Sequence, residues 1–250
     1  MNELFEFYIE KKIYVTFLME FLAAVTGTIF LFLSPGVSKY KRLFVYFLWS
    51  VFIIDFSGGY SLWAYFDNYQ TAPFLKDSPF SRNTWYYNLA QIYFILCYSY
   101  FIQSEILNPK FKTFIRRGAA LYLIYAVVLI LFGSDIFQAY NVPILLVGAI
   151  WISVSVGVYL YDLLTSDKIL HFKRNLFFYV FTGIFIYFLI VQPINIYSVY
   201  FLEANPDFIN LFASVLRYAN VFLYGMFILG FIVVIFNKTE KRRSKTRRIR

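Results

Sequence analysis

Long apolar stretches recur along this 250-residue chain and constrain its fold more than any other feature. A helix rises 1.5 Å per residue, so about 20 apolar residues cross the roughly 30 Å hydrocarbon core of a bilayer. Stretches of that length, separated by short polar segments, predict an all-α, polytopic membrane protein built as a seven-transmembrane-helix bundle. The expected spans are residues 13–33, 43–63, 84–104, 115–132, 142–164, 176–196 and 211–236.

The composition agrees with this class of protein. The chain is 60% hydrophobic and 15% charged, whereas soluble domains are roughly 25% charged. No linker rich in Pro, Ser or Gly divides it, so we expect one transmembrane domain over residues 1–237 and a basic cytoplasmic tail over 238–250. The first residues lack the basic segment and small-residue cleavage site of a signal peptide, so the first span is expected to stay in the protein.

The distribution of basic residues predicts the orientation in the membrane. Most of the 23 Lys and Arg residues lie after the first, third and fifth expected spans or in the tail, and the opposite segments hold only Lys11, Lys12, Lys76 and Arg82. Because cytoplasmic loops are enriched in Lys and Arg, the N-terminus is expected outside and the C-terminus in the cytoplasm.

This basic face also accounts for the net charge of +9. Each Lys or Arg near an anionic membrane surface contributes about 1 kcal/mol to lipid attraction. The expected partners are therefore the lipid bilayer and its anionic lipids, with a separate membrane or cytoplasmic protein docking on the tail as an alternative. A nucleic-acid partner is not expected.

An arginine inside the last apolar stretch, Arg217, is the most unusual polar residue. A charged side chain near the middle of a span costs roughly 2.5–3.5 kcal/mol, so it should face the protein interior and have acidic partners. Glu20 and Asp55 are available, and counting residues from the outer span ends puts all three at one level in the outer half. The same level holds the amides of Asn88, Gln91, Gln192, Asn195 and Asn220.

Two interpretations of this polar level stay open. In the first, Arg217 pairs with Glu20 or Asp55 inside a closed bundle, and the amides cross-link helices. In the second, an outward-open pocket uses Arg217 to hold an anionic or polar ligand, and the two carboxylates set its charge balance. The lone cysteine, Cys97, and the lone histidine, His171, predict neither a disulfide nor a metal site, and no cofactor is expected.

These interpretations lead to three hypotheses of function. The first is a receptor-like or sensory module that binds a small molecule in the outer pocket, with Pro193 beside Gln192 as a flexing point. The second is a structural or assembly subunit whose buried ion pair is architectural. The third is a proton-coupled transporter that uses Glu20 and Asp55 as proton sites. We find no GxSxG or HExxH motif and no paired aspartates, so catalytic residues and an enzymatic role are not expected.

The first two spans carry a resemblance to a known group of proteins. The residues concerned are Gly27-Thr28-Ile29-Phe30, Lys39-Tyr40-Lys41, Phe47-Leu48-Trp49 and Asp55, which are similar to those of uncharacterised seven-span inner-membrane proteins of Bacteroidota-type bacteria. The resemblance implies a multi-pass protein of a bacterial inner membrane and no known activity. Arg82-Asn83-Thr84-Trp85 superficially resembles the third helix of microbial rhodopsins, but the last span has no lysine for a retinal Schiff base.

Overall fold

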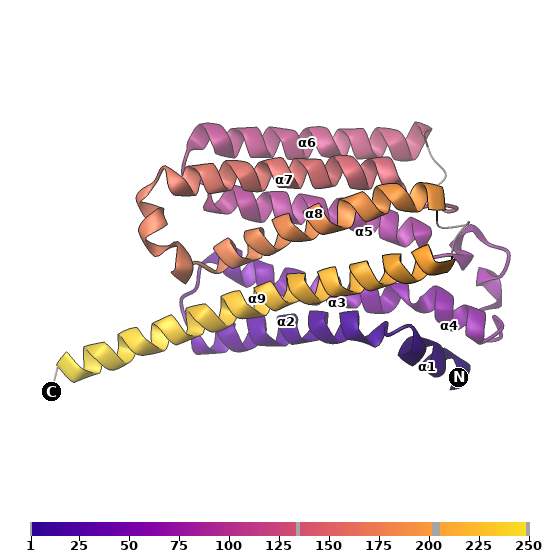
Figure 1. The fold of residues 1–250 in the computed structure, drawn as a ribbon, viewed down its shortest axis with the longest axis horizontal. Helices are drawn as coiled ribbons and strands as arrows, with labels where there is room; N and C mark the ends of the chain where they lie inside the picture. The colour runs from indigo at the N-terminus through magenta and orange to yellow at the C-terminus, as the bar shows by residue number, and fades with distance from the viewer. Residues whose placement is uncertain (1, 134–135, 202–205, 249–250) are drawn as a thin grey trace.

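In the part of the chain that the structure describes, seven long helices form the body of the molecule (Figure 1). The computed structural model describes residues 2–133, 136–201 and 206–248, and no strand occurs within them. The long helices are α2 (Tyr14–Leu33), α3 (Lys39–Gly58), α5 (Thr84–Glu105), α6 (Pro109–Phe132), α7 (Val142–Leu164), α8 (Leu176–Phe201) and α9 (Pro206–Arg248). The all-helical prediction is confirmed for the described residues.

Shorter elements lie at the two ends of this bundle. At the end that carries the N-terminus, Figure 1 shows α1 (Asn2–Glu10) and α4 (Tyr60–Phe66), which continues α3 after Gly59. The turns η1 (Pro73–Leu75) and η2 (Pro79–Ser81) follow α4, and η3 (Asp167–Arg174) connects α7 to α8 at the opposite end. The two chain ends lie at opposite ends of the bundle.

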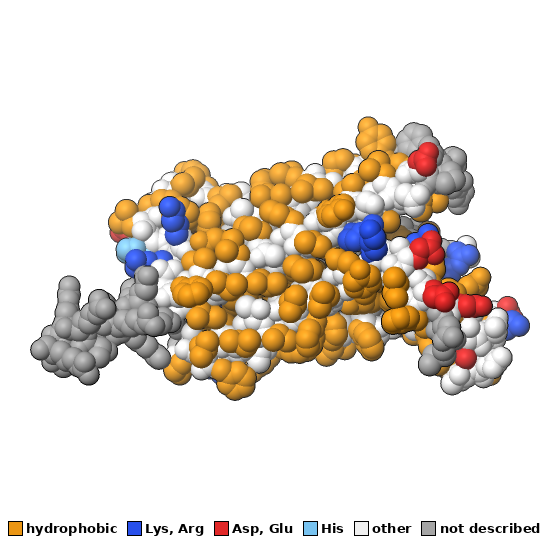
Figure 2. All heavy atoms as spheres, turned by 60° about the horizontal axis from the view of Figure 1, so that its bottom comes forward, with side chains coloured by type: hydrophobic (Ala, Val, Ile, Leu, Met, Phe, Trp, Pro, Cys, Tyr) orange, Lys and Arg blue, Asp and Glu red, His pale blue; other side chains and the backbone are white. Residues whose placement is uncertain are grey.

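Among the described residues, six helices are long and apolar enough to cross a membrane, so by length and composition the chain is a multi-pass membrane protein. Large apolar side chains are widely exposed along them; Tyr218, for example, is 72% exposed. Figure 2 shows hydrophobic side chains covering most of one face, with acidic side chains gathered near the N-terminal end. A soluble protein rarely exposes so large an apolar surface.

The helix outside this set is α5, which spans 22 residues but is less apolar than the other six. Its sequence interleaves tyrosines with the polar residues Asn88, Gln91 and Gln103. It nevertheless packs inside the bundle against α3, α6 and α7. The predicted seventh crossing therefore rests on packing rather than on hydropathy.

Local signals at the helix ends explain where the elements begin and stop. The side chain of Asn108 accepts a hydrogen bond from the Lys110 amide at 2.9 Å, and Pro109 follows at the first helical position. This arrangement favours a helix start, so α6 begins before the predicted residue 115. The Ser34-Pro35-Gly36 turn separates α2 from α3, and Gly36 adopts a φ of +79° that favours glycine.

The later helices are longer than their apolar stretches. Helix α8 continues through Pro193 to Phe201, beyond the predicted end at residue 196. Helix α9 begins at Pro206 rather than near 211, and its backbone stays helical through the predicted tail as far as Arg248. The length of an apolar stretch indicates which part of a helix can cross the membrane. It does not indicate where the helix ends, because polar residues can continue the helix into water.

Two sets of helices meet in the bundle. Helices α5, α6 and α7 pack on one another, and α2 packs on both α3 and α9; α8 lies between these sets in Figure 1. A Cβ atom at Gly118 of α6 would overlap the ring of Trp151 on α7, so only glycine fits there. The indole of Trp151 also donates to the Ser99 hydroxyl on α5 at 3.1 Å.

The core between the two sets is largely aromatic. Phe44 of α3 packs edge-on against Phe101 of α5, Phe177 of α8 and Phe227 of α9, with ring centroids 5.4 to 5.7 Å apart. Such tilted pairs add roughly 0.5–1.5 kcal/mol each beyond the area they bury. Phe44 therefore joins four helices at one level of the bundle.

Candidate functional site

Glu20, on α2, is the most deeply buried carboxyl group that the structure describes. It is 1% exposed, and neither of its carboxyl oxygens makes a hydrogen bond of normal geometry within the described residues. Its carboxyl group interacts with that of Asp55 on α3 and faces the hydroxyl of Tyr224 on α9. Burying a carboxylate without partners costs several kcal/mol, so this position calls for an explanation beyond packing.

Asp55 completes a carboxyl pair with Glu20. The two side chains interact directly from neighbouring helices, and Asp55 is only partly buried. The Tyr87 hydroxyl donates to the Asp55 backbone carbonyl at 3.4 Å. Within the described residues, no Lys or Arg forms an ion pair with either carboxylate.

Four tyrosines surround the carboxyl pair and interact with it electrostatically. They come from three further helices, and we refer to them as the tyrosine cluster: Tyr87 and Tyr98 on α5, Tyr187 on α8 and Tyr224 on α9. Phenolic hydroxyls can donate to a carboxylate or offer an oxygen to a cation. The pair and the cluster together form the candidate site.

Two glutamine side chains add unsatisfied polar atoms to the interior. The side-chain oxygen of Gln91 and both amide atoms of Gln192 are buried without a hydrogen-bond partner. Gln91 follows Tyr87 by one helical turn and precedes Tyr98 by two, so it lies on the α5 face that carries these tyrosines. Gln192 is on α8, the helix of Tyr187, and directly precedes Pro193.

Asn88 has a different role from the one that the sequence suggested. Its amide nitrogen donates to the carbonyls of Ile136 and Ala139, each at 3.0 Å, and its oxygen accepts from the Asn141 amide at 2.8 Å. Asn141 in turn caps the start of α7 through the Ile144 amide. Asn88 therefore holds the segment before α7 in place.

Arg217 does not join the two carboxylates. Its guanidinium donates to the Ser214 hydroxyl, one turn earlier on the same helix, at 3.2 Å, and within the described residues it forms no ion pair. Arg217 precedes Tyr224, which faces Glu20, by two turns, about 10 Å along α9. The expected membrane level of Arg217 stays a prediction. Asn220 on α9 and Asn195 on α8 are both partly buried.

The sequence-based selection also missed a second buried carboxylate, Asp162 on α7. It is 6% exposed, and its two oxygens accept the backbone amides of Leu107 and Asn108 at 2.6 and 3.1 Å. These amides belong to the turn between α5 and α6. The only signal in the sequence is the position of Asp162 just before the end of an apolar stretch.

The site residues determine what chemistry is available. No group of three or more His, Cys, Asp or Glu able to hold a metal ion occurs within the described ranges. Two adjacent carboxyl groups, phenolic hydroxyls and an amide oxygen can hold a proton or a small cation that favours oxygen ligands. Comparison with known proteins gave no match: no protein-family model, curated protein or solved structure is similar to the chain.

Proposed function

We propose that this protein is a cation-coupled membrane transporter in which Glu20 and Asp55 bind the coupling proton or monovalent cation. The observation that carries the proposal is the burial of Glu20 beside a second carboxyl group, with neither of its oxygens in a hydrogen bond of normal geometry to the described residues. Two adjacent carboxylates in a low-dielectric interior need a compensating positive charge. Since no fixed Lys or Arg of the described chain supplies it, the charge comes from solution and is exchangeable.

Helix irregularities near the site support coupling of this charge to movement. Gly58 and Gly59 follow Asp55 within about one turn, and α3 ends there and is followed by α4. Pro193 lies inside α8 beside Gln192, where a proline removes one backbone hydrogen bond of the helix. Transporters often place their coupling-ion sites next to discontinuous helices.

The proposal includes a topology with seven crossings. Helix α5 would be the seventh, since it packs against three of the other long helices, and the separation of the chain ends in Figure 1 favours termini on opposite sides. The distribution of Lys and Arg supports an outer N-terminus and a cytoplasmic C-terminus. The resemblance of the first two spans supports a bacterial inner membrane.

The two other hypotheses have weaker support. A receptor-like module with its ligand on Arg217 requires that side chain to face a pocket. The Arg217 guanidinium instead donates a hydrogen bond to Ser214 on its own helix. A purely structural subunit requires the carboxylates to be compensated by fixed partners. The receptor-like and structural hypotheses both stay predictions made from the sequence.

Cation binding is tested first, on the full chain in nanodiscs by infrared difference spectroscopy during pH and Na⁺ titrations. We expect wild-type protein to show a protonated-carboxyl band that Na⁺ or rising pH removes, and Glu20→Gln to lack it. Glu10→Gln, which alters an exposed carboxylate on α1, is the control and should retain the band. Identical spectra from wild type and Glu20→Gln would contradict the site.

Transport is tested separately by solid-supported membrane electrophysiology on proteoliposomes. Candidate solutes are added one at a time, and a coupled solute should give a transient current with wild-type protein and with Glu10→Gln. Glu20→Gln and Asp55→Asn should abolish that current. A current that survives both substitutions would show that the carboxyl pair does not couple transport.

A further inference from the structure

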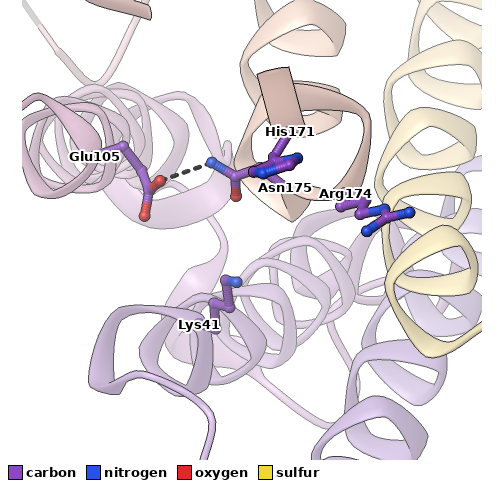
Figure 3. Close-up of a pocket in the computed structure, with 5 residues that line it drawn as sticks. All are labelled: Lys41, Glu105, His171, Arg174 and Asn175. Atoms are coloured by element: carbon purple, nitrogen blue, oxygen red, sulfur yellow. Dashed lines mark hydrogen bonds between the residues drawn. The ribbon is translucent and has the colours of Figure 1, made fainter. Parts of the chain in front are cut away.

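A second polar site lies at the opposite end of the bundle from the N-terminus. An open pocket of about 340 Å³ is bordered there by the start of α3, the end of α5 and the η3 turn. Its volume falls within the roughly 300–1,000 Å³ of small-molecule sites. The residues that line it are Lys41, Glu105, His171, Arg174 and Asn175 (Figure 3).

Glu105, the one acidic residue that lines this pocket, is fixed by hydrogen bonds. The Glu105 carboxylate accepts a hydrogen bond from the Asn175 side chain at 2.8 Å, and Figure 3 shows the two side chains directed at each other. The backbone carbonyl of Glu105 accepts from the Lys168 ammonium at 2.7 Å. Lys168 thus adds a further positive charge at the carboxyl end of α5, where a helix favours cations.

The two other charged side chains of the pocket are basic and come from separate elements. Lys41 reaches from α3 toward the Glu105–Asn175 pair, and Arg174 comes from η3, which also supplies the imidazole of His171 (Figure 3). Lys and Arg together outnumber the single carboxylate that lines the pocket. Clustered Lys and Arg with ring N–H donors are suited to phosphate oxygens.

We propose that this pocket binds a phosphate group, with Lys41 and Arg174 opposing its charge and His171 donating a hydrogen bond. The phosphate can be the head group of an anionic phospholipid or a free phosphate, because the same contacts serve both. Its place at the predicted cytoplasmic ends of the helices is where basic pockets bind anionic lipid head groups. The proposal goes beyond cation coupling and does not depend on it.

The test compares two double variants of the full chain in detergent. Lys41→Gln with Arg174→Gln removes one Lys and one Arg from the pocket, and Arg42→Gln with Lys173→Gln removes the same two types from exposed neighbours on the same elements. Binding is measured by titration calorimetry with dihexanoyl phosphatidylglycerol, with inorganic phosphate and with dihexanoyl phosphatidylcholine.

We expect the pocket variant to bind phosphatidylglycerol or phosphate about 30-fold more weakly than wild type, since each basic residue contributes about fivefold. The control variant should stay within about twofold of wild type because neither Arg42 nor Lys173 lines the pocket. Binding of phosphatidylglycerol alone identifies a lipid head group, and equal binding of inorganic phosphate identifies a free phosphate. Equal losses in the two variants, or binding of neither probe, would overturn the proposal.

A measurement on the wild-type chain avoids any loss of folding in a variant. Lysine acylation by a water-soluble reagent is quantified by peptide mass spectrometry with and without the probe that binds. The probe should protect Lys41 and leave Lys39, two residues away on the exposed surface, as reactive as before. Equal protection of both lysines would show that the probe covers the whole basic face rather than the pocket.

Discussion

Asp162 and Glu20 are both buried carboxyl groups within long helices, but their surroundings differ. Asp162 accepts two backbone amides from the α5–α6 turn, so its charge completes a helix connection. Glu20 has no hydrogen-bond partner of normal geometry within the described residues and faces another carboxyl group. Burial alone therefore does not identify a working site. What distinguishes the two residues is the number of carboxyl oxygens that lack a partner of normal geometry among the described residues: two for Glu20 and none for Asp162.

The same difference separates two amides on α5. Asn88 satisfies both ends of its side chain on the segment before α7, whereas the Gln91 oxygen, one turn deeper in the bundle, has no partner. Polar side chains near helix ends find backbone groups that lack intrahelical partners. In the middle of a helix those backbone groups are already bonded, so a polar side chain there depends on a ligand or another side chain.

The largest effect is expected for Asp162→Ala. It leaves the amides of Leu107 and Asn108 without their acceptor. Hydrogen bonds to charged groups contribute about 1.5–3 kcal/mol each, so the free energy of unfolding should fall by about 3 kcal/mol. Thermal unfolding in detergent, followed by tryptophan fluorescence, measures the change. Asp167→Ala, at an exposed residue of η3, is the control; equal melting of the two variants would contradict a structural role for Asp162.

Asn88→Ala should rank second, with a loss of about 2 kcal/mol, because three hydrogen bonds to the segment before α7 disappear. Hydrogen exchange at the Asn141 and Ile144 amides should also accelerate. Gln91→Ala provides the matched control on the same helix and should leave that exchange unchanged. If Gln91→Ala destabilised the segment as much as Asn88→Ala, the two amides would not differ as described.

Glu20→Gln should have a smaller effect, of the opposite sign. Replacing a buried carboxyl group without fixed partners by a neutral amide should stabilise the protein by about 1 kcal/mol. The same unfolding assay measures it, at neutral pH and low Na⁺, with Glu10→Gln as the control. A loss of stability comparable to that of Asp162→Ala would show that Glu20 is a structural carboxylate as well.

The smallest effect concerns Asp67, a carboxylate outside the membrane spans. The Thr71 hydroxyl and backbone amide donate to it at 2.6 and 2.7 Å, and these hydrogen bonds lower the pKa of Asp67 below its ordinary value of 3.8. The pKa of Asp67 is lower in the folded than in the unfolded chain. Its contribution to folding stability is therefore present above pH 3.8 and is lost as the pH falls through the lowered pKa.

An NMR titration of the Thr71 amide should therefore show its midpoint below pH 3.8, the ordinary pKa of an aspartate. Asp67→Asn is the control and should remove the titration while leaving the fold unchanged. A midpoint above pH 3.8 would contradict the two hydrogen bonds.

The helices were more predictable from sequence than the site. Residues 13–33, 84–104 and 142–164 match α2, α5 and α7 closely, because apolar length and Pro or Gly signals act locally. The sequence also suggested that Glu20 and Asp55 lie at one level, and the structure brings them together. It suggested Arg217 as their partner, whereas the guanidinium donates to Ser214 on its own helix. It also placed the start of α9 too late, because the polar residues Asp207 and Asn210 end the apolar stretch without ending the helix. Side-chain pairing depends on helix rotation, which no local pattern fixes.

The close contact at Gly118 links three helices of the bundle. The Trp151 ring of α7 lies against Gly118 of α6, and its indole donates to the Ser99 hydroxyl of α5. Glu20 and Asp55 come from α2 and α3, whereas Tyr87 and Tyr98 come from α5. On the proposed function, a cation that binds to or leaves the carboxyl pair therefore acts across the boundary between the two sets of helices, on one side of which the wedged indole ties α5, α6 and α7 together.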